Sequence, residues 1–160
     1  MQSHNANDRG VRFRVCQLIN KLLNSMGENM QIDEELYDKI YDCMLLRLRD
    51  KVPIIRVQAV LAMTRLQNPR DNDCPVINAF LFLLGCDPNQ DVRRAVLSCI
   101  AASTKTLPAI LERTRDTKDS VRKLAYQVIA EKIHIKAFTI AQRERLLQEG
   151  LSDREGEFQP

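Results

Sequence analysis

Basic residues recur at a fixed distance after aspartates in this 160-residue chain. Three aspartates are each followed, five and six residues later, by an apolar residue and then an arginine. A guanidinium group can form a two-pronged ion pair with a carboxylate, and it can equally bind a phosphate. The pattern therefore offers either an internal set of ion pairs or an anion-binding surface. The pairs are Asp50 with Arg56, Asp87 with Arg93, and Asp116 with Arg122.

Internal ion pairs have a physical basis, because each arginine falls at the start of an expected helix. A positive charge there opposes the helix dipole, so a carboxylate partner is favoured. Arg93, for example, can reach Asp87 in its own unit or Asp116 in the next. We therefore predict a structural ladder in which these arginines bond the turn aspartates. Its members are Asp50, Arg56, Asp87, Asp116 and Arg122.

The basic residues left over by this ladder are candidates for contacts with a partner. Cations aligned along one wall bind a phosphate backbone without reading its sequence. No aromatic residues alternate with them to stack on bases, so any nucleic-acid contact should be made to the backbone of a duplex. This set consists of Arg14, Lys51, Arg94, Lys118 and Lys123.

These residues need helices to position them, and the stretch 87–100 shows how. Asp87-Pro88 is typical of a tight turn, and Asp91 stands where a helix favours an N-cap or first-turn acid. Apolar residues then recur with helical spacing. We expect further helices over residues 11–25 and 33–49, after Pro53, over 75–85, from 108 to about 115, after 120, and over 140–148. Gly27 and Gly150 are expected to end helices. The helix at 11–25 is expected to bury Val11, Val15, Leu18, Ile19 and Leu22.

The same turn-and-helix pattern returns along the chain. The spacing from Asp50 to Asp87 is 37 residues, from Asp87 to Asp116 it is 29, and from Asp116 to Asp153 it is 37 again. Paired helices at such intervals resemble HEAT repeats. The predicted fold is an all-α HEAT-repeat α-solenoid of paired antiparallel helices, with about three full repeats and cut half-repeats at the ends. We expect a polar lead-in over 1–10, a repeat segment over 11–153, and a polar tail over 154–160 that is a truncated repeat of a longer solenoid.

Composition limits the class of protein. Hydrophobic residues make up 44% and aromatic residues 5%, with no Trp, so the core should be aliphatic. The net charge of +3 permits a nucleic-acid partner without requiring one. Five cysteines without a C-x-x-C pair favour a reducing compartment. No apolar run reaches the length of a membrane span, and no secretory signal is visible at Met1. The chain is expected to be soluble and intracellular.

Residues for catalysis are sparse. His4 and His134 are the two histidines and lie far apart in the sequence. His134 resembles a helix-end residue. The clustered ligands that zinc requires are missing, and so are the glycine loops that hold phosphates. The sequence therefore predicts no enzyme, no cofactor, no metal and no small-molecule substrate.

Five strings resemble the condensin subunit 3 (CAP-G) family. Together they extend from Ser3 to Arg154, which is almost the whole chain. The strings are residues 3–19, 92–100, 105–108, 121–128 and 150–154.

This resemblance implies a non-catalytic HEAT-repeat subunit of condensin that acts in mitotic chromosome condensation. The expected partners are the kleisin subunit, duplex DNA bound without sequence preference and, indirectly, the SMC ATPase subunits, but no membrane. The expected locations are the nucleus, the cytoplasm and mitotic chromosomes. The resemblance gives as DNA-binding candidates Arg12, Arg14, Lys51, Arg93, Arg94 and Lys123.

A second hypothesis from another class stays open. The same fold serves as a protein-interaction scaffold or adaptor whose groove takes an apolar or acidic peptide. That hypothesis predicts no DNA binding at physiological salt. An enzyme is a distant third reading, because its catalytic residues would have to come from outside this chain.

Overall fold

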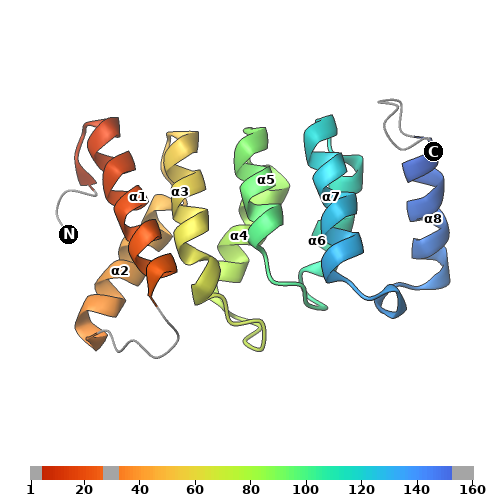
Figure 1. Cartoon of the computed structure of the whole chain (residues 1–160), viewed down its shortest axis with the longest axis horizontal. Coiled ribbons are helices and arrows are strands. Elements are labelled where there is room, and N and C mark those ends of the chain that lie inside the picture. The colour runs from red at the N-terminus through yellow and green to blue at the C-terminus, as the bar shows by residue number, and fades with distance from the viewer. Residues whose placement is uncertain (1–4, 27–32, 153–160) are drawn as a thin grey trace. The chain divides into compact units, whose positions relative to one another are not determined.

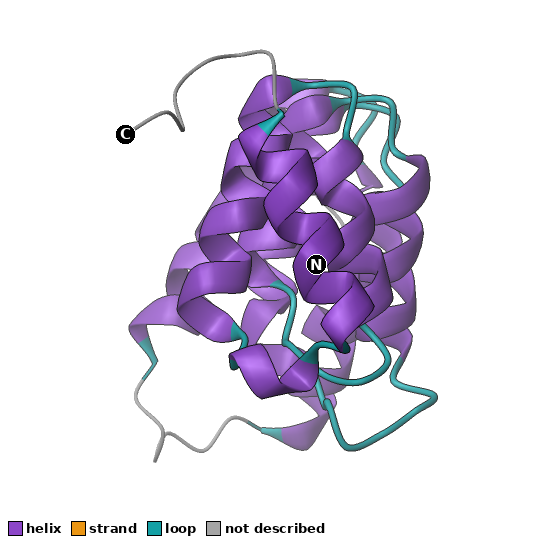
Figure 2. Ribbon diagram, turned by 90° about the vertical axis from the view of Figure 1, so that its right-hand side faces the viewer, coloured by secondary structure: helices purple, strands orange, loops and turns teal. Residues whose placement is uncertain are grey.

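The computed structural model describes residues 5–26 and 33–152, and all of the regular structure in these ranges is helical (Figure 2). The helices fall into two compact units, residues 1–101 and 102–160. The prediction of an all-α fold of paired helices is confirmed. The predicted boundaries at residues 10 and 153 stay predictions.

The first unit holds five α-helices in two layers. Helices α1, α3 and α5 pack side by side, while α2 and α4 lie behind them (Figure 1). A short 3-10 helix, η2, continues α3. The bounds are α1 Arg9–Ser25, α2 Glu34–Arg47, α3 Pro53–Met63, η2 Thr64–Leu66, α4 Pro75–Cys86 and α5 Gln90–Cys99.

The second unit repeats this scheme with a shorter first helix. Helix α6 and the 3-10 helix η3 pack against α7, and α8 contacts η3. The shortness of α6 accounts for the 29-residue spacing between Asp87 and Asp116. The bounds are α6 Leu107–Glu112, η3 Arg113–Arg115, α7 Asp119–Lys132, η4 Ile135–Ala137 and α8 Ile140–Leu151.

Most helices start where local chemistry favours a start. The side chain of Asp8 accepts a hydrogen bond from the backbone N–H of Val11 at 2.9 Å. Asn89 caps α5, so Asp91 is the first-turn acid of that helix and not its N-cap. Proline occupies the first turn of α3, α4 and α6, where its missing N–H costs nothing.

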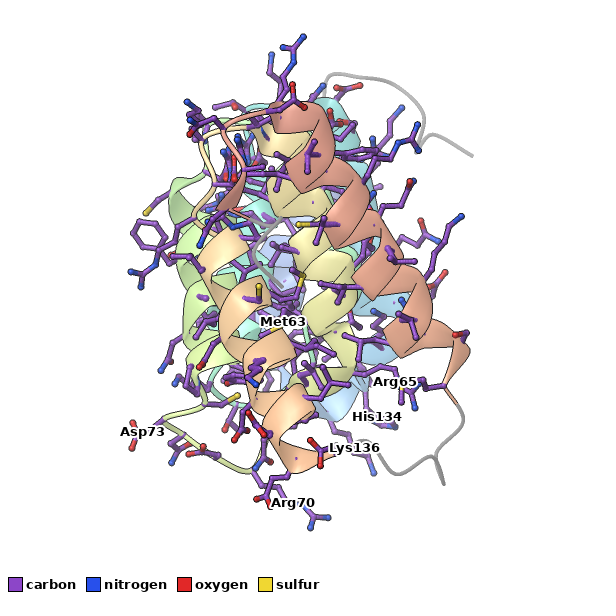
Figure 3. The ribbon with its side chains drawn as sticks, turned by 90° about the vertical axis from the view of Figure 1, so that its left-hand side faces the viewer. Met63, Arg65, Arg70, Asp73, His134 and Lys136 are labelled. Carbon is purple, nitrogen blue, oxygen red and sulfur yellow. The ribbon has the colours of Figure 1, made fainter. Side chains whose placement is uncertain are left out.

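The core is aliphatic, with Phe80 as its largest fully buried side chain. Met63 lies inside the first unit (Figure 3). The buried face of α3 includes Ile55, Ala59, Ala62 and Met63. Other fully buried side chains in this unit include Met44, Leu48, Ile55, Ile77, Leu84 and Leu97.

Two local predictions were wrong. The buried residues of α1 are Arg12, Cys16, Ile19 and Leu23, whereas Leu18 is 61% exposed and Leu22 is 48% exposed. Ile19 is buried as expected, whereas the other buried positions each follow an expected one by one residue, beginning with Arg12. Gly150 does not end its helix, since α8 continues to Leu151 and is capped by Ser152. The expected helix end at Gly27 lies outside the described residues.

Candidate nucleic-acid interface and the aspartate–arginine ladder

Each turn aspartate closes the turn in which it lies. The Oδ1 atom of Asp50 accepts a hydrogen bond from the backbone N–H of Val52 at 2.9 Å. Asp87 accepts one from Asn89 at 2.9 Å. Asp116 accepts one from Lys118 at 3.0 Å. In all three turns the bond comes from the residue two positions later, so the side chain holds the backbone ready for the next helix.

The arginine six residues later returns to the same turn. Its Nη1 atom donates to the carbonyl oxygen of the aspartate, which leaves the carboxylate open to other donors. The three bonds are Arg56 to Asp50 at 2.7 Å, Arg93 to Asp87 at 2.8 Å and Arg122 to Asp116 at 3.1 Å.

In the first unit the arginine of one repeat also forms an ion pair with the aspartate of the next. Arg56 reaches Asp87 with Nε at 2.7 Å and Nη2 at 2.8 Å. Arg12 reaches Asp50 in the same way, with Nε at 2.9 Å and Nη2 at 3.3 Å. Such two-pronged pairs fix orientation as well as distance. The ladder therefore crosses from α1 to the turn before α3, and from α3 to the turn before α5.

Arg12 and Arg93 are buried residues, which does not fit the DNA contacts expected of them. Arg12 is 5% exposed, and its remaining Nη1 atom donates to the carbonyls of Ala6 at 2.8 Å and Asn7 at 2.9 Å. Arg93 is 7% exposed. Little of either guanidinium faces solvent, so both belong with the structural ladder.

One member of the Asp50 cluster was missed in the sequence. Arg47 donates to Asp50 Oδ2 at 2.8 Å and has only 12% of its side chain exposed. In the second unit, Arg113 Nη1 likewise donates to Asp116 Oδ2 at 3.3 Å. The signal was an arginine three residues before the turn aspartate, which is one helical turn.

The surroundings of Asp50 decide its charge state. Burial alone would raise the pKa of this carboxyl, but the hydrogen bonds from Val52 and Arg12, together with the charges of Arg12 and Arg47, outweigh it. The net effect lowers the pKa of Asp50 below its ordinary value. Asp50 is therefore an ionised carboxylate held between two arginines at neutral pH.

The exposed candidates of the first unit lie near the N-terminal ends of the three front helices. Arg14 projects from α1, Lys51 from the turn before α3, and Arg94 from the first turns of α5. The Arg14 guanidinium stacks 5.8 Å from the Phe13 ring centroid, and Arg94 lies 3.8 Å from Asp91. These helices pack on one another, so the structure brings the three cations to one end of the layer. Lys123, in α7, and Lys118, in the turn before it, belong to the second unit.

The described residues also bear on metal binding, on membrane crossing and on the reactivity of a buried thiol. Within 5–26 and 33–152, no group of three His, Cys, Asp or Glu side chains is placed to hold a metal ion. The part of the chain that the structure covers contains no helix long and apolar enough to cross a bilayer. The buried thiol of Cys16 has its pKa raised by burial to about 11, so it stays protonated.

Comparison with known proteins gives a consistent result. A family model described as "Sister chromatid cohesion protein PDS5 protein" matches residues 1–152. Condensin complex subunit 3 of Homo sapiens is 62% identical over 96% of this chain, and that of Xenopus laevis is 64% identical over the same share. The Schizosaccharomyces pombe protein is 41% identical over 94% of the chain. The chain spans about 15% of the length of the human and frog relatives.

A solved structure shows the same fold. It is the crystal structure of the S. pombe condensin Cnd3–Cnd2 subcomplex, which matches with a TM-score of 0.86 at 39% identity. The match covers 97% of this chain and 20% of the chain in that structure.

Proposed function

The chain belongs both to the family that the PDS5 model describes and to the condensin subunit 3 family, and on this premise we propose that it is a non-catalytic HEAT-repeat segment of condensin. In this proposal it binds the kleisin subunit and the backbone of duplex DNA during mitotic chromosome condensation. Its proposed locations are the nucleus, the cytoplasm and mitotic chromosomes. The SMC ATPase subunits are indirect partners that supply the catalysis.

The similarity to the Cnd3–Cnd2 subcomplex supports the kleisin part of the proposal. In that structure the matching protein is paired with another condensin subunit, Cnd2. We assign the same kind of partner to this chain, with Cnd2 in the position of the kleisin.

The DNA part rests on the exposed cations at the N-terminal ends of α1, α3 and α5. Arg14, Lys51 and Arg94 are exposed and come from three helices or turns that pack in one layer. Cations held by a rigid layer bind phosphates without selecting a base sequence. Lys123 is the corresponding candidate of the second unit. Arg12 and Arg93 contribute indirectly, because Arg12 binds the turn that carries Lys51 and Arg93 binds the turn before α5, which carries Arg94.

The test is a titration of the chain with duplex DNA at two salt concentrations, with and without the kleisin. We expect an affinity that falls steeply with salt and rises when the kleisin is present. The double variant Arg14→Glu, Arg94→Glu should bind about tenfold or more weakly and show a shallower salt dependence. The matched control is Lys21→Glu, Arg70→Glu, which makes the same charge change at exposed positions outside this surface.

The outcomes separate the two hypotheses. Equal loss in both double variants would reject the assigned surface and leave only a general charge effect. Kleisin binding without any DNA affinity at physiological salt would support the scaffold or adaptor alternative instead.

A further inference from the structure

All of the polar groups of Asp50, in the turn between α2 and α3, are bonded within the protein. Its Oδ2 atom accepts from Arg12 Nε at 2.9 Å and from Arg47 Nη1 at 2.8 Å, while Oδ1 accepts from the N–H of Val52. The N–H of Asp50 donates to the carbonyl of Arg47 at 3.1 Å, and its own carbonyl accepts from Arg56 at 2.7 Å. Both the backbone and the side chain of Asp50 are therefore fixed.

The two residues beside Asp50 in the sequence are both basic and both exposed. They are Arg49 and Lys51. Within residues 5–26 and 33–152, neither side chain forms a hydrogen bond or an ion pair with another residue. The carboxylate between them is already bonded to two arginines and to a backbone N–H, so it is not available to neutralise them.

The buried groups next to this pair add to its positive charge. Arg12 and Arg47 share the single carboxylate of Asp50, so the buried cluster carries a net positive charge. The buried Nε atom of Arg47 has no hydrogen-bond acceptor among the described residues. Charges below the surface are screened by salt less than exposed charges. The cluster therefore strengthens the field that Arg49 and Lys51 present to solvent, and the turn favours an anion.

The other two turn aspartates do not have such a pair beside them. Asp87 has no basic neighbour in the sequence. Asp116 has one, Arg115, but Glu149 already binds its guanidinium. The pair of exposed cations is thus a feature of the Asp50 turn and not of the repeat in general.

We propose that Asp50 is a positioning residue for phosphate binding, which holds Arg49 and Lys51 as a pair of contacts to the backbone of duplex DNA. The inference rests on the DNA-binding function proposed above, and it adds Arg49 to the contacts. A guanidinium can bind a phosphate through two N–H donors, and an ammonium supplies a point charge beside it. Evenly spaced phosphates also allow one duplex to contact this turn and the exposed cations of α1 and α5 together.

The first experiment measures binding of a fluorescein-labelled DNA duplex to the full chain by fluorescence anisotropy over a series of salt concentrations. The double variant Arg49→Gln, Lys51→Gln should bind about tenfold more weakly. The slope of log affinity against log salt should become shallower by about two, since two phosphate contacts are lost. The matched control is Lys21→Gln, Arg70→Gln, which removes the same two charges at exposed positions outside the turn and should change the slope much less.

The second experiment tests the role of Asp50 itself. Asp50→Asn removes a negative charge, which by charge alone should strengthen DNA binding. We expect it to weaken binding several-fold instead, because the turn loses the ion pairs that hold it. The control Asp42→Asn makes the same charge change on the exposed surface of α2 and should not weaken binding.

A double-mutant cycle separates positioning from a general loss of structure. In the Arg49→Gln, Lys51→Gln background, Asp50→Asn should have little further effect on DNA affinity, since the groups that it positions are gone. A general loss of structure would weaken binding equally in both backgrounds. Circular dichroism shows whether Asp50→Asn is folded, and if it is not, the variants of Arg49 and Lys51 decide the test.

Four outcomes would overturn the proposal. They are a native affinity and salt slope in Arg49→Gln, Lys51→Gln, stronger DNA binding in Asp50→Asn, equal loss from Asp50→Asn in both backgrounds, and polyglutamate that displaces the labelled duplex as well as unlabelled duplex does. The last would assign the pair to an acidic protein segment.

The same measurements distinguish this inference from the proposed function. A native chain that binds no duplex DNA would reject both. DNA binding that is lost in Arg14→Glu, Arg94→Glu but is unchanged in Arg49→Gln, Lys51→Gln would keep the proposed function and reject the Asp50 turn alone.

Discussion

Two carboxylates in this chain are each held by two arginines, but in opposite surroundings. Asp50, in the first unit, binds Arg12 at 2.9 Å and Arg47 at 2.8 Å, and 3% of its side chain is exposed. Glu149, in the second unit, binds Arg115 and lies 2.9 Å from Arg145. Its side chain is 24% exposed, and both of its arginines are more than half exposed.

The difference shows that the number of ion pairs does not measure their importance. Water screens the Glu149 cluster and can replace either arginine when the other leaves. Asp50 has no such substitute, because its partners are buried and its carboxylate also holds the backbone of the turn. Removing one partner of a buried pair leaves a charge without compensation. We therefore expect the two clusters to respond very differently to the same change.

The largest effect is expected for Asp50→Ala. It leaves Arg12 and Arg47 buried beside an empty position and frees the N–H of Val52. The free energy of unfolding should fall by about 3–5 kcal/mol, measured by urea denaturation with circular dichroism. Asp42→Ala on the exposed surface of α2 is the control. If Asp50→Ala and Asp42→Ala lower the free energy of unfolding by similar amounts, then burial does not make the Asp50 cluster more important than the Glu149 cluster.

The next effect is expected for Arg56→Lys. A lysine ammonium cannot make the bonds to both Asp87 oxygens and to the Asp50 carbonyl that the guanidinium makes at once. We expect a loss of about 2 kcal/mol in the free energy of unfolding, with charge unchanged. If Arg56→Lys has native stability, then the charge and not the forked geometry holds the repeats together.

Acid should remove the stabilising contribution of the Asp50 carboxylate. The folded-state pKa of Asp50 is lowered, so its stabilising contribution is complete above the unfolded-state value of about 4 and is lost as the pH falls through the folded value. The stability gap between the native chain and Asp50→Asn, measured from urea midpoints, should therefore narrow from pH 6 to pH 3. A constant gap over this range would show that the ionised form of Asp50 is not what stabilises the turn.

The smallest effect is expected for Glu149→Gln. The pKa of Glu149 is lowered mainly by its hydrogen bond from Arg115, yet the partners are exposed and screened. We expect a loss of at most about 1 kcal/mol, which should disappear in high salt. Glu144→Gln, at an exposed position of the same helix, is the comparison. A larger and salt-resistant loss would place this cluster with Asp50.

Much of the fold could be predicted because its signals are local. The turn at Asp87 and the start of α3 at Pro53 depend on residues within one helical turn, and both appear as expected. The contact between Arg56 and Asp87 joins residues 31 positions apart. It was foreseen as one of two alternatives, because a repeated pattern lets one unit predict the surroundings of the next.

The failures occur where a distant partner overrides the local pattern. Leu18 and Leu22 have helical spacing but are exposed, since the buried stripe of α1 contains Arg12 instead. That arginine turns inward because Asp50, 38 residues away, offers it a carboxylate. Hydrophobicity alone cannot show that a guanidinium is buried, so the same residue was expected at a DNA surface. In α8, Gly150 lies beside the Tyr126 ring, and the helix continues past it to Leu151.

The forked contacts also bear on how such a chain can change in length. Arg12 and Asp50 are 38 residues apart, while Arg56 and Asp87 are 31 apart, yet both pairs form the same two bonds. The extra residues are accommodated in the helices and connections between the paired positions. Insertions or deletions in a connection such as residues 69–73 can therefore occur without shifting one helix along its neighbour, because the arginine and aspartate fix that alignment from the opposite end.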